Sequence, residues 1–489
     1  MRNLLFFLVI YQVVSRIIMA QDFSKNVFEN YENYKEQSIT RRNFRHSEIL
    51  PLIEKLKKNK IFSVSKIGQS VEDRDIFLIK AGHGQTSILL WSQMHGDEST
   101  ATMALFDIFN FFSANDQFNE LRKELLDNLT IYFIPMLNPD GAERFQRRNA
   151  LEIDINRDAA RLESPESRIL KSTRDSLNPL FGFNLHDQSP RYSAGGCFRS
   201  ASISFLAPPV SYEKEVNPVR ERAMKLIVEL NRVLSEFIPG HVGKYSDDFE
   251  PRAFGDNIQR WGTSTILIET GGWKHDLQKQ FLRKINFTIL LSAFKSIAVN
   301  SYTRHSIKHY YSIPDNKENI FDLLIRNIKL QINGIYYKTD IGINRYETID
   351  GNKSICYSGI IEDMGDLSTF SGYEEYLSDD PGFEAVMGEI YPEVFEDYQD
   401  LAKVNFEELL KKGFTSVLVK NGLPKEIFPT YPISIKSFAN STNTDEIKTG
   451  SAANFLLKER GKIKYAVING FVYNLSTSTN SILNTTVVR

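Results

Sequence analysis

Apolar runs and amphipathic stretches alternate through the first three hundred residues of the chain. Runs of consecutive apolar residues such as 88–91 are typical of buried strands, whereas the apolar spacing over 47–58 is that of one helical face. Strands that alternate with helices predict an α/β domain with a mixed central sheet flanked by helices, assigned to residues 21–305. We expect strands at 62–80 (two strands), 88–91, 129–134, 181–186 and 264–268, and helices at 47–58, 100–112, 121–126, 219–237 and 277–299.

The pattern changes from residue 306 onwards. Two hairpin signatures, Asn333-Gly334 and Asn469-Gly470, are each flanked by β-branched and aromatic residues. One helix is expected at 398–412. We therefore predict a β-rich accessory region of unknown role over residues 306–489.

Residues 1–20 form a separate segment, in which an apolar block from Leu4 to Ile18 is followed by the small residue Ala20. This arrangement is typical of a secretory signal peptide. Arg16 interrupts the block, and the uninterrupted apolar part is shorter than the roughly 20 residues of a membrane span. We therefore expect a secreted or periplasmic protein, cleaved near Ala20, whose mature chain has no membrane span.

Charge and cysteine content narrow the class of protein further. The 489 residues include 59 basic and 61 acidic side chains, a formal net charge of -2, with no long basic run. Nucleic-acid binding normally requires a clustered basic surface, so it is not expected. The two cysteines, Cys197 and Cys356, lie in different predicted regions, and we expect two unpaired thiols although export would permit a disulfide.

The first candidate chemistry follows the predicted strand at 88–91, where His95 and Glu98 occupy a turn that contains glycine. An imidazole and a carboxylate can converge there on one cation, and the pair suits zinc at a catalytic site. A bare His-x-x-Glu spacing is common by chance, and a polar turn in which Asp97 or Ser99 caps the next helix is the alternative. A metal site therefore requires a third ligand and a base elsewhere.

Two further candidates end predicted strands. His186 closes the run 181–186 and is a candidate third ligand, although a lone histidine is more often structural. Glu269 follows the run 264–268, where burial raises the pKa of a carboxylate toward that of a general base; a capping or turn role is the alternative. Because ligands gather at the carboxyl ends of strands in α/β sheets, we expect His95, His186 and Glu269 to lie together.

A polar cluster precedes these strands. The alternation of Ile153 and Ile155 predicts a strand that carries Asp154 and Asn156 on one side, with Arg157 following. Asp154 can accept the second N–H of a metal-bound histidine. Arg157 and Asn156 can together grip a carboxylate.

The order of these residues along the chain resembles that of the zinc metallocarboxypeptidase family typified by carboxypeptidase A. The resemblance covers residues 45–300, and the ordered set is far more specific than any one of its motifs. The set comprises His95-x-x-Glu98, Asn138-Pro-Asp-Gly141, Arg147, Asp154-x-Asn156-Arg157, His186 and Glu269.

The resemblance implies a carboxypeptidase-like fold and one zinc ion per chain, bound by His95, Glu98 and His186. It further implies that Glu269 is the general base for the attacking water. Arg147 would polarise the scissile carbonyl group and hold its oxyanion.

On the substrate side, the resemblance implies a peptide with a free C-terminal carboxylate, which Asn156 and Arg157 would hold. Asp154 falls where the family keeps a partner of the first histidine, and Tyr245 is the nearest match to the tyrosine that closes over the substrate. The residues after His186 depart from the family pattern. The resemblance therefore does not predict which substrate side chain the pocket prefers.

Two other functions stay open at this point. A zinc-dependent amide deacylase of the succinylglutamate desuccinylase or aspartoacylase type shares the metal spacing, although the Asn138-Pro-Asp-Gly141 turn and the Thr270-Gly-Gly after the base favour a peptidase. A catalytically silent protein that binds cell wall or carbohydrate has no need for three ligands and a base. The sequence therefore favours a secreted zinc metallocarboxypeptidase that hydrolyses C-terminal residues from peptides.

Overall fold

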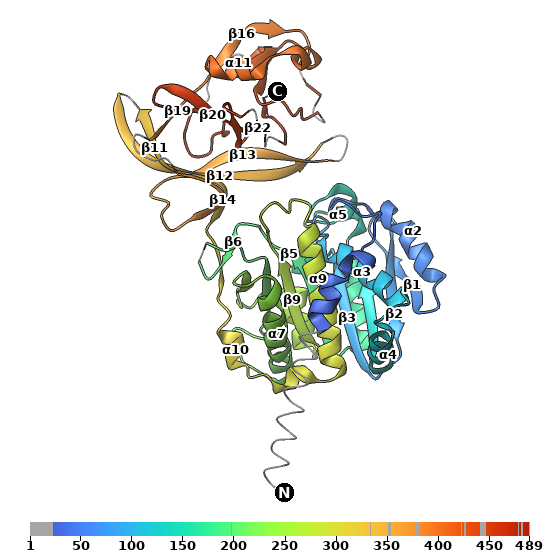
Figure 1. Cartoon of the computed structure of the whole chain (residues 1–489). Coiled ribbons are helices and arrows are strands. Elements are labelled where there is room, and N and C mark those ends of the chain that lie inside the picture. Colours follow the sequence, from blue (N-terminus) through green and yellow to red (C-terminus); the bar gives the residue numbers. More distant parts are fainter. Residues whose placement is uncertain are drawn as a thin grey trace. The chain divides into compact units, whose positions relative to one another are not determined.

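The computed structural model describes residues 23–488, apart from residues 197, 333, 351–353, 378–381, 422, 425–426, 441–445, 478 and 481–482. The chain divides into two compact units, with the boundary between Glu318 and Asn319 (Figure 1). The predicted signal peptide at 1–20 lies outside the described residues. None of the helices that are described combines the length and the apolar character needed to cross a membrane.

One mixed sheet organises the N-terminal unit. Its strands are β1 (Phe62–Gln69), β2 (Asp75–Gly82), β3 (Thr86–Ser92), β4 (Leu129–Ile134), β5 (Phe181–Asp187), β7 (Ile203–Leu206), β8 (Val242–Lys244) and β9 (Ser264–Thr270). Among the described residues the sheet has eight strands in the order β1-β2-β4-β3-β5-β9-β7-β8. The four central strands β4, β3, β5 and β9 are parallel, while β2 and β7 are antiparallel to their central neighbours. The predicted mixed central sheet is confirmed.

Helices cover both faces of this sheet. They are α2 (His46–Lys57), α3 (Thr100–Ser113), α4 (Asn119–Asn128), α5 (Pro139–Arg144), α6 (Pro165–Leu177), α7 (Pro218–Phe237), α8 (Phe254–Arg260), α9 (Gln280–Ala298) and α10 (Lys308–Tyr311), with short 3-10 turns η1 (Tyr31–Asn33), η2 (Ile155–Arg157) and η3 (Ser301–Arg304). A small ribbon pairs β6 (Tyr192–Ala194) with β10 (Asn316–Glu318).

The strands are apolar on both sides because each side packs against helices. In β3, Ile88 and Leu90 join the core that contains residues of α3, α7 and α9. Leu89 and Trp91 face the opposite core, which includes residues of α6 and α8. Side chains that follow β3, β5 and β9 therefore emerge together at the carboxyl edge, where the two cores end.

Two sequence predictions in this unit require correction. Residues 153–157 do not form a strand: the Asp154 carboxylate accepts the Asn156 backbone N–H at 2.9 Å, and η2 follows. The Asn138-Pro-Asp-Gly141 stretch is not only a turn, because Asn138 caps α5 and Pro139 occupies its first turn. In both places a side-chain cap decides the local structure.

The C-terminal unit is rich in strands, as predicted. Its larger sheet contains β11 (Ile320–Ile332), β12 (Ile335–Ile349), β13 (Ile355–Gly365), β14 (Ser371–Leu377), β15 (Phe383–Val386), β19 (Phe455–Glu459), β20 (Lys462–Ile468), β21 (Phe471–Asn474) and β22 (Thr479–Asn480). A smaller parallel sheet contains β16 (Glu389–Phe395), β17 (Phe414–Val419), β18 (Ser434–Ser437) and β23 (Val487–Val488). The remaining short elements are η4 (Tyr398–Lys403), α11 (Phe406–Lys411) and η5 (Phe438–Asn440).

The hairpin between β20 and β21 is confirmed at the predicted position. Ile468 pairs with Phe471, and Asn469 and Gly470 both have positive φ, at 53° and 72°. The strands β11 and β12 also form a hairpin, although Asn333 lies outside the described residues. The single helix predicted at 398–412 is wrong, because the chain forms η4 and then α11, which Asn405 caps.

Of the two cysteines, Cys356 is a free and buried thiol. Cys197 lies outside the described residues.

Candidate metal centre

The first two candidate ligands leave the sheet at the carboxyl end of β3. Gln93 follows that strand with φ of 52°, a left-handed conformation that turns the chain sharply before His95. Its side-chain amide donates to the carbonyl oxygen of Gly96 at 2.8 Å and closes the loop. Glu98 comes next, just before α3, so both ligands lie on one short, strained loop at the sheet edge.

The Asn138-Pro-Asp-Gly141 stretch supports this loop. The Asn138 side chain accepts the Gly141 N–H at 2.9 Å and donates to the carbonyl oxygen of Met94 at 3.2 Å. A Cβ atom on Gly96 would lie 2.0 Å from the carbonyl carbon of Gly141. The two loops therefore touch backbone to backbone, and position 96 accepts only glycine.

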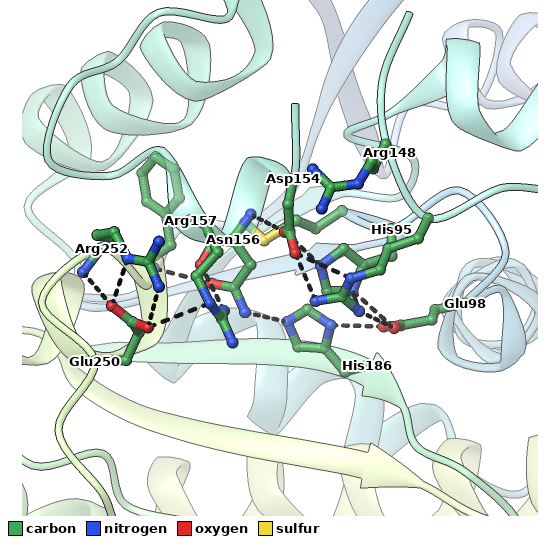
Figure 2. A network of polar contacts seen from close by, with 12 residues as sticks. His95, Glu98, Arg148, Asp154, Asn156, Arg157, His186, Glu250 and Arg252 are labelled. Carbon is green, nitrogen blue, oxygen red and sulfur yellow. Dashed lines mark hydrogen bonds and ion pairs between the residues drawn. The ribbon is translucent and has the colours of Figure 1, made fainter. Parts of the chain in front are cut away.

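His95, Glu98 and His186 converge on one point (Figure 2). The Nδ1 atom of His95 lies 2.7 Å from one oxygen of Glu98, and the Nδ1 atom of His186 lies 2.6 Å from the other. Their ligand atoms are all within 4.8 Å of one another, and no other group of three such ligands is found among the described residues. Two imidazoles and one carboxylate are a donor set of catalytic zinc sites.

The charge around His95 favours a cation. Its Nε2 atom lies 3.1 Å from the Asp154 carboxylate, on the side of the ring opposite Glu98. Burial opposes a charged imidazole, but Glu98 and Asp154 outweigh burial and raise the pKa of His95 to about 9. A metal ion can replace the proton held between a ligand carboxylate and the ring. The residues present therefore fit a bound zinc ion and the outer partner that such a histidine normally has.

Arg147 lies against the same cluster. Its Nη2 atom is 2.8 Å from the Asp154 carboxylate, and its Nη1 atom is 3.3 Å from Glu98. Burial disfavours the ionised form of Asp154, yet His95 and Arg147 hold the pKa of that carboxyl well below its usual range. A fixed positive group thus lies beside the three candidate ligands.

Asn156 and Arg157 lie in η2, next to the cluster (Figure 2). The Asn156 side-chain oxygen accepts the Phe254 N–H at 2.9 Å, and its amide nitrogen lies 3.4 Å from Nε2 of His186. The Nη1 atom of Arg157 donates to the Asn156 carbonyl oxygen at 2.8 Å. The two residues predicted to hold a carboxylate are therefore neighbours of the candidate metal ligands.

Glu269 lies beside His186, because these two residues are paired across β5 and β9. It is buried, and burial together with the Glu98 carboxylate raises the pKa of Glu269 well above its usual value. Tyr245 follows β8, and burial together with the Glu269 charge raises the pKa of its hydroxyl above the usual value. The tyrosine therefore lies within electrostatic reach of Glu269.

Two residues that the sequence pattern does not indicate complete the network. Glu250 and Arg252 lie in the loop between β8 and α8, and the Glu250 carboxylate is 3.4 Å from Nε of Arg157 (Figure 2). A Glu-x-Arg pair in a loop carries no periodic signal. Only the tertiary fold brings residue 250 beside residue 157.

Residues 49–185 match the model of the zinc carboxypeptidase family. This match confirms the resemblance inferred from the ordered motifs. It includes His95 and Glu98 but stops one residue before His186. The proximity of His186 and Glu269 to the first two ligands therefore comes from the structure alone.

Individual relatives match short parts of the chain. Carboxypeptidase SOL1 of Arabidopsis thaliana is 27% identical over 106 residues, which cover 20% of this chain and 22% of that protein. Carboxypeptidase D of Mus musculus is 29% identical over 96 residues, or 18% of this chain and 7% of that protein. The matched part thus spans less than a quarter of the length of either relative.

Among solved structures, the metallo-carboxypeptidase from Burkholderia cenocepacia aligns with a TM-score of 0.43 and 15% identity, over 53% of this chain and 70% of that one.

Proposed function

We propose that this chain is a zinc-dependent carboxypeptidase that removes C-terminal residues from peptides. His95, Glu98 and His186 would hold one zinc ion. The observation that carries the proposal is the convergence of these three side chains, with both Nδ1 atoms facing the Glu98 carboxylate. The match of residues 49–185 to a zinc carboxypeptidase family supports the same reaction class.

When bound, zinc would polarise the substrate carbonyl and lower the pKa of a water molecule toward neutrality. Glu269 accepts a proton from the attacking water and returns it to the leaving amine nitrogen. Its burial beside His186 suits this role, because a raised pKa brings a carboxylate closer to the range in which it exchanges protons at neutral pH.

Arg147 supplies positive charge where the oxyanion develops. Asp154 holds Nε and Nη2 of its guanidinium, at 3.0 and 2.8 Å, and so keeps this positive charge beside the candidate metal ligands. Asp154 holds the ring orientation of His95 through Nε2.

Asn156 and Arg157 hold the terminal carboxylate of the peptide. Recognition of that group places the last peptide bond at the reacting centre, which makes the enzyme an exopeptidase. Tyr245, whose hydroxyl lies within electrostatic reach of Glu269, would close over the bound substrate. The substrate is therefore a peptide with a free C-terminus.

We also propose that the protein is exported. The apolar segment from Leu4 to Ile18, followed by Ala20, supports cleavage by a signal peptidase. N-terminal sequencing of the exported protein should begin at Gln21.

Release of C-terminal residues from synthetic peptides tests the proposed activity. Each N-acetylated peptide is offered with a free carboxylate and as its C-terminal amide, and N-acyl amino acids serve as deacylase substrates. We expect release from the peptide acids, at least about 100-fold slower release from the amides, and loss of both on chelation with recovery on adding zinc. Hydrolysis of N-acyl amino acids alone would favour the deacylase, and no hydrolysis in any case would contradict the proposal.

A further inference from the structure

The segment at residues 250–254, which is the end of the loop between β8 and α8 together with the first residue of α8, contacts both candidate carboxylate-binding residues in η2. The Phe254 N–H donates to the Asn156 side-chain oxygen at 2.9 Å, and Glu250 faces Nε of Arg157. The N–H of Ala159 donates to the Arg252 carbonyl oxygen at 3.0 Å. The loop is therefore fastened to the segment that carries the carboxylate grip.

Glu250 is itself held firmly within this loop (Figure 2). The Arg252 guanidinium donates to both of its oxygens, through Nε at 2.9 Å and Nη2 at 2.7 Å. The backbone N–H of Glu250 donates to the Asp256 carboxyl group at 3.1 Å. The hydrogen bonds from Arg252 outweigh burial and lower the pKa of the Glu250 carboxyl group to about 2, so the side chain is ionised at neutral pH.

Glu250 contacts the Arg157 guanidinium at its Nε atom. Nε lies 3.4 Å from the Glu250 carboxylate, while Nη1 donates to the Asn156 carbonyl oxygen at 2.8 Å. Anchoring at two nitrogens fixes the plane of the guanidinium. A fixed donor plane is what recognition of a carboxylate by two parallel hydrogen bonds requires.

We propose that Glu250, clamped by Arg252, is a positioning residue that orients Arg157 for the terminal carboxylate of the substrate. This inference rests on the carboxylate-binding role of Arg157 in the proposed function. The opposite role, an internal carboxylate that competes with the substrate, would place both Glu250 oxygens on two donors of the guanidinium, whereas both oxygens accept hydrogen bonds from Arg252. The contact through Nε favours positioning.

A substitution that keeps the charge separates these two roles. Glu250→Asp retains a carboxylate but withdraws it by about one carbon–carbon bond, roughly 1.5 Å, from Arg157. Arg252→Lys keeps the positive charge but loses the bidentate clamp on Glu250. Glu236→Asp makes the same chemical change at an exposed position of α7 and serves as the matched control.

The experiment is isothermal titration of each variant with an N-acetylated peptide acid and its amide. The zinc-loaded chain carries Glu269→Gln, so that turnover of the substrate during the titration is negligible. We expect Glu250→Asp to weaken binding of the acid about 5- to 20-fold while binding of the amide stays unchanged. Arg252→Lys should also lower the ratio of affinity for the acid to affinity for the amide, and Glu236→Asp should leave this ratio unaltered.

The inference is overturned if Glu250→Asp and Arg252→Lys leave the ratio of acid to amide affinity unchanged. Tighter binding of the acid would identify Glu250 as an internal competitor instead. Absence of any preference for the acid in the parent chain would remove the carboxylate site and the inference with it. A preference that Glu250→Asp reduces, in a protein that hydrolyses no peptide, would support the inference while the proposed activity fails.

Discussion

The candidate metal centre depends on how single residues hold His95. Its two ring nitrogens face different carboxylates, Glu98 on one side and Asp154 on the other. Asp154 is in turn fixed by Arg147 and by the Asn156 N–H. In the proposed function, Asp154 would set the ring orientation and the tautomer that present Nδ1 to a metal ion.

Replacing Asp154 should weaken zinc binding without removing a ligand. Asp154→Asn keeps the shape of the side chain but loses the charge that faces Nε2 of His95. We expect zinc affinity to fall about 10- to 100-fold, as is usual for partners of metal-bound histidines. Competition with a chromogenic chelator measures the affinity, and Asp175→Asn on the partly exposed end of α6 is the control. Equal affinity in both variants would show that Asp154 does not act through His95.

We expect Asp256 to make the stability of the fold depend on pH. Burial raises the pKa of this carboxyl group to about 7, whereas an unfolded aspartate titrates near 3.9. Because the folded pKa is the higher one, the folded state keeps its proton between these values and the unfolded state does not. The contribution of the buried carboxyl group to stability is therefore fully present below about pH 4 and is lost as pH rises toward about 7.

Asp256→Asn should remove this dependence, because an amide oxygen can still accept the Glu250 N–H. The shift of about three pKa units sets an upper limit of about 4 kcal/mol, and relaxation of the site should reduce the measured difference to about 1–2 kcal/mol. Urea unfolding should therefore show the variant more stable than the wild type at pH 8 and close to it at pH 4.5. If the variant differed from the wild type in stability by the same amount at both pH values, the raised pKa of Asp256 would be contradicted.

At the scale of single residues, sequence order predicts the candidate metal ligands but not the residues that surround them. His95, His186 and Glu269 follow apolar runs, and parallel strands bring such positions to one sheet edge. The positions of Glu250 and Arg252 beside Arg157 are not predictable in this way. Their loop has no periodic pattern, and its distance from residue 157 is set only by folding.

Among the elements, α3 and α9 are joined by a buried ion pair. Both Asp107 and Arg283 are fully buried, and Nε of Arg283 lies 2.7 Å from the carboxylate. The same carboxylate accepts the Tyr31 hydroxyl at 3.0 Å, and Arg283 also donates to the carbonyl oxygen of Ile39 at 2.6 Å. The pair therefore connects the N-terminal segment that contains Tyr31 and Ile39 to helices α3 and α9.

Breaking this pair from one side should destabilise the N-terminal unit strongly. Arg283→Met leaves the Asp107 charge buried without its partner, at a cost of about 3–5 kcal/mol in the free energy of unfolding. Adding Asp107→Asn should recover at least about 1 kcal/mol relative to the sum of the single effects. Denaturant unfolding of the four proteins in this cycle measures the coupling, and strict additivity would show that the two side chains do not stabilise each other.

The pattern of apolar residues predicts the central elements well, because propensity and burial agree there. The strand predicted at 129–134 coincides with β4, and the helix predicted at 100–112 differs from α3 by one residue. The helix α6 is not indicated, since it is largely polar, although Ser164 and Pro165 provide a helix-start signal. The segment 153–157 departs from its alternating pattern because the Asp154 side chain caps the backbone.

At the scale of the whole molecule, the candidate site belongs to one of two units. All nine predicted site residues and the family match precede the boundary at Glu318. The C-terminal unit buries separate apolar clusters of its own. Its hairpin at Asn469-Gly470 is predictable from local turn chemistry, whereas the parallel pairing of β18 with β23 joins segments far apart in the sequence and leaves no local signal.

Zinc content and C-terminal release, measured together on the wild type and on Glu269→Gln, test the central claim most directly. The account predicts one zinc per chain in both proteins, because Glu269 is not a ligand. It also predicts release by the wild type and a loss of at least about 1,000-fold in the variant, which lacks the general base. A wild type without zinc, or a zinc-loaded variant that retains the wild-type rate, would contradict the account.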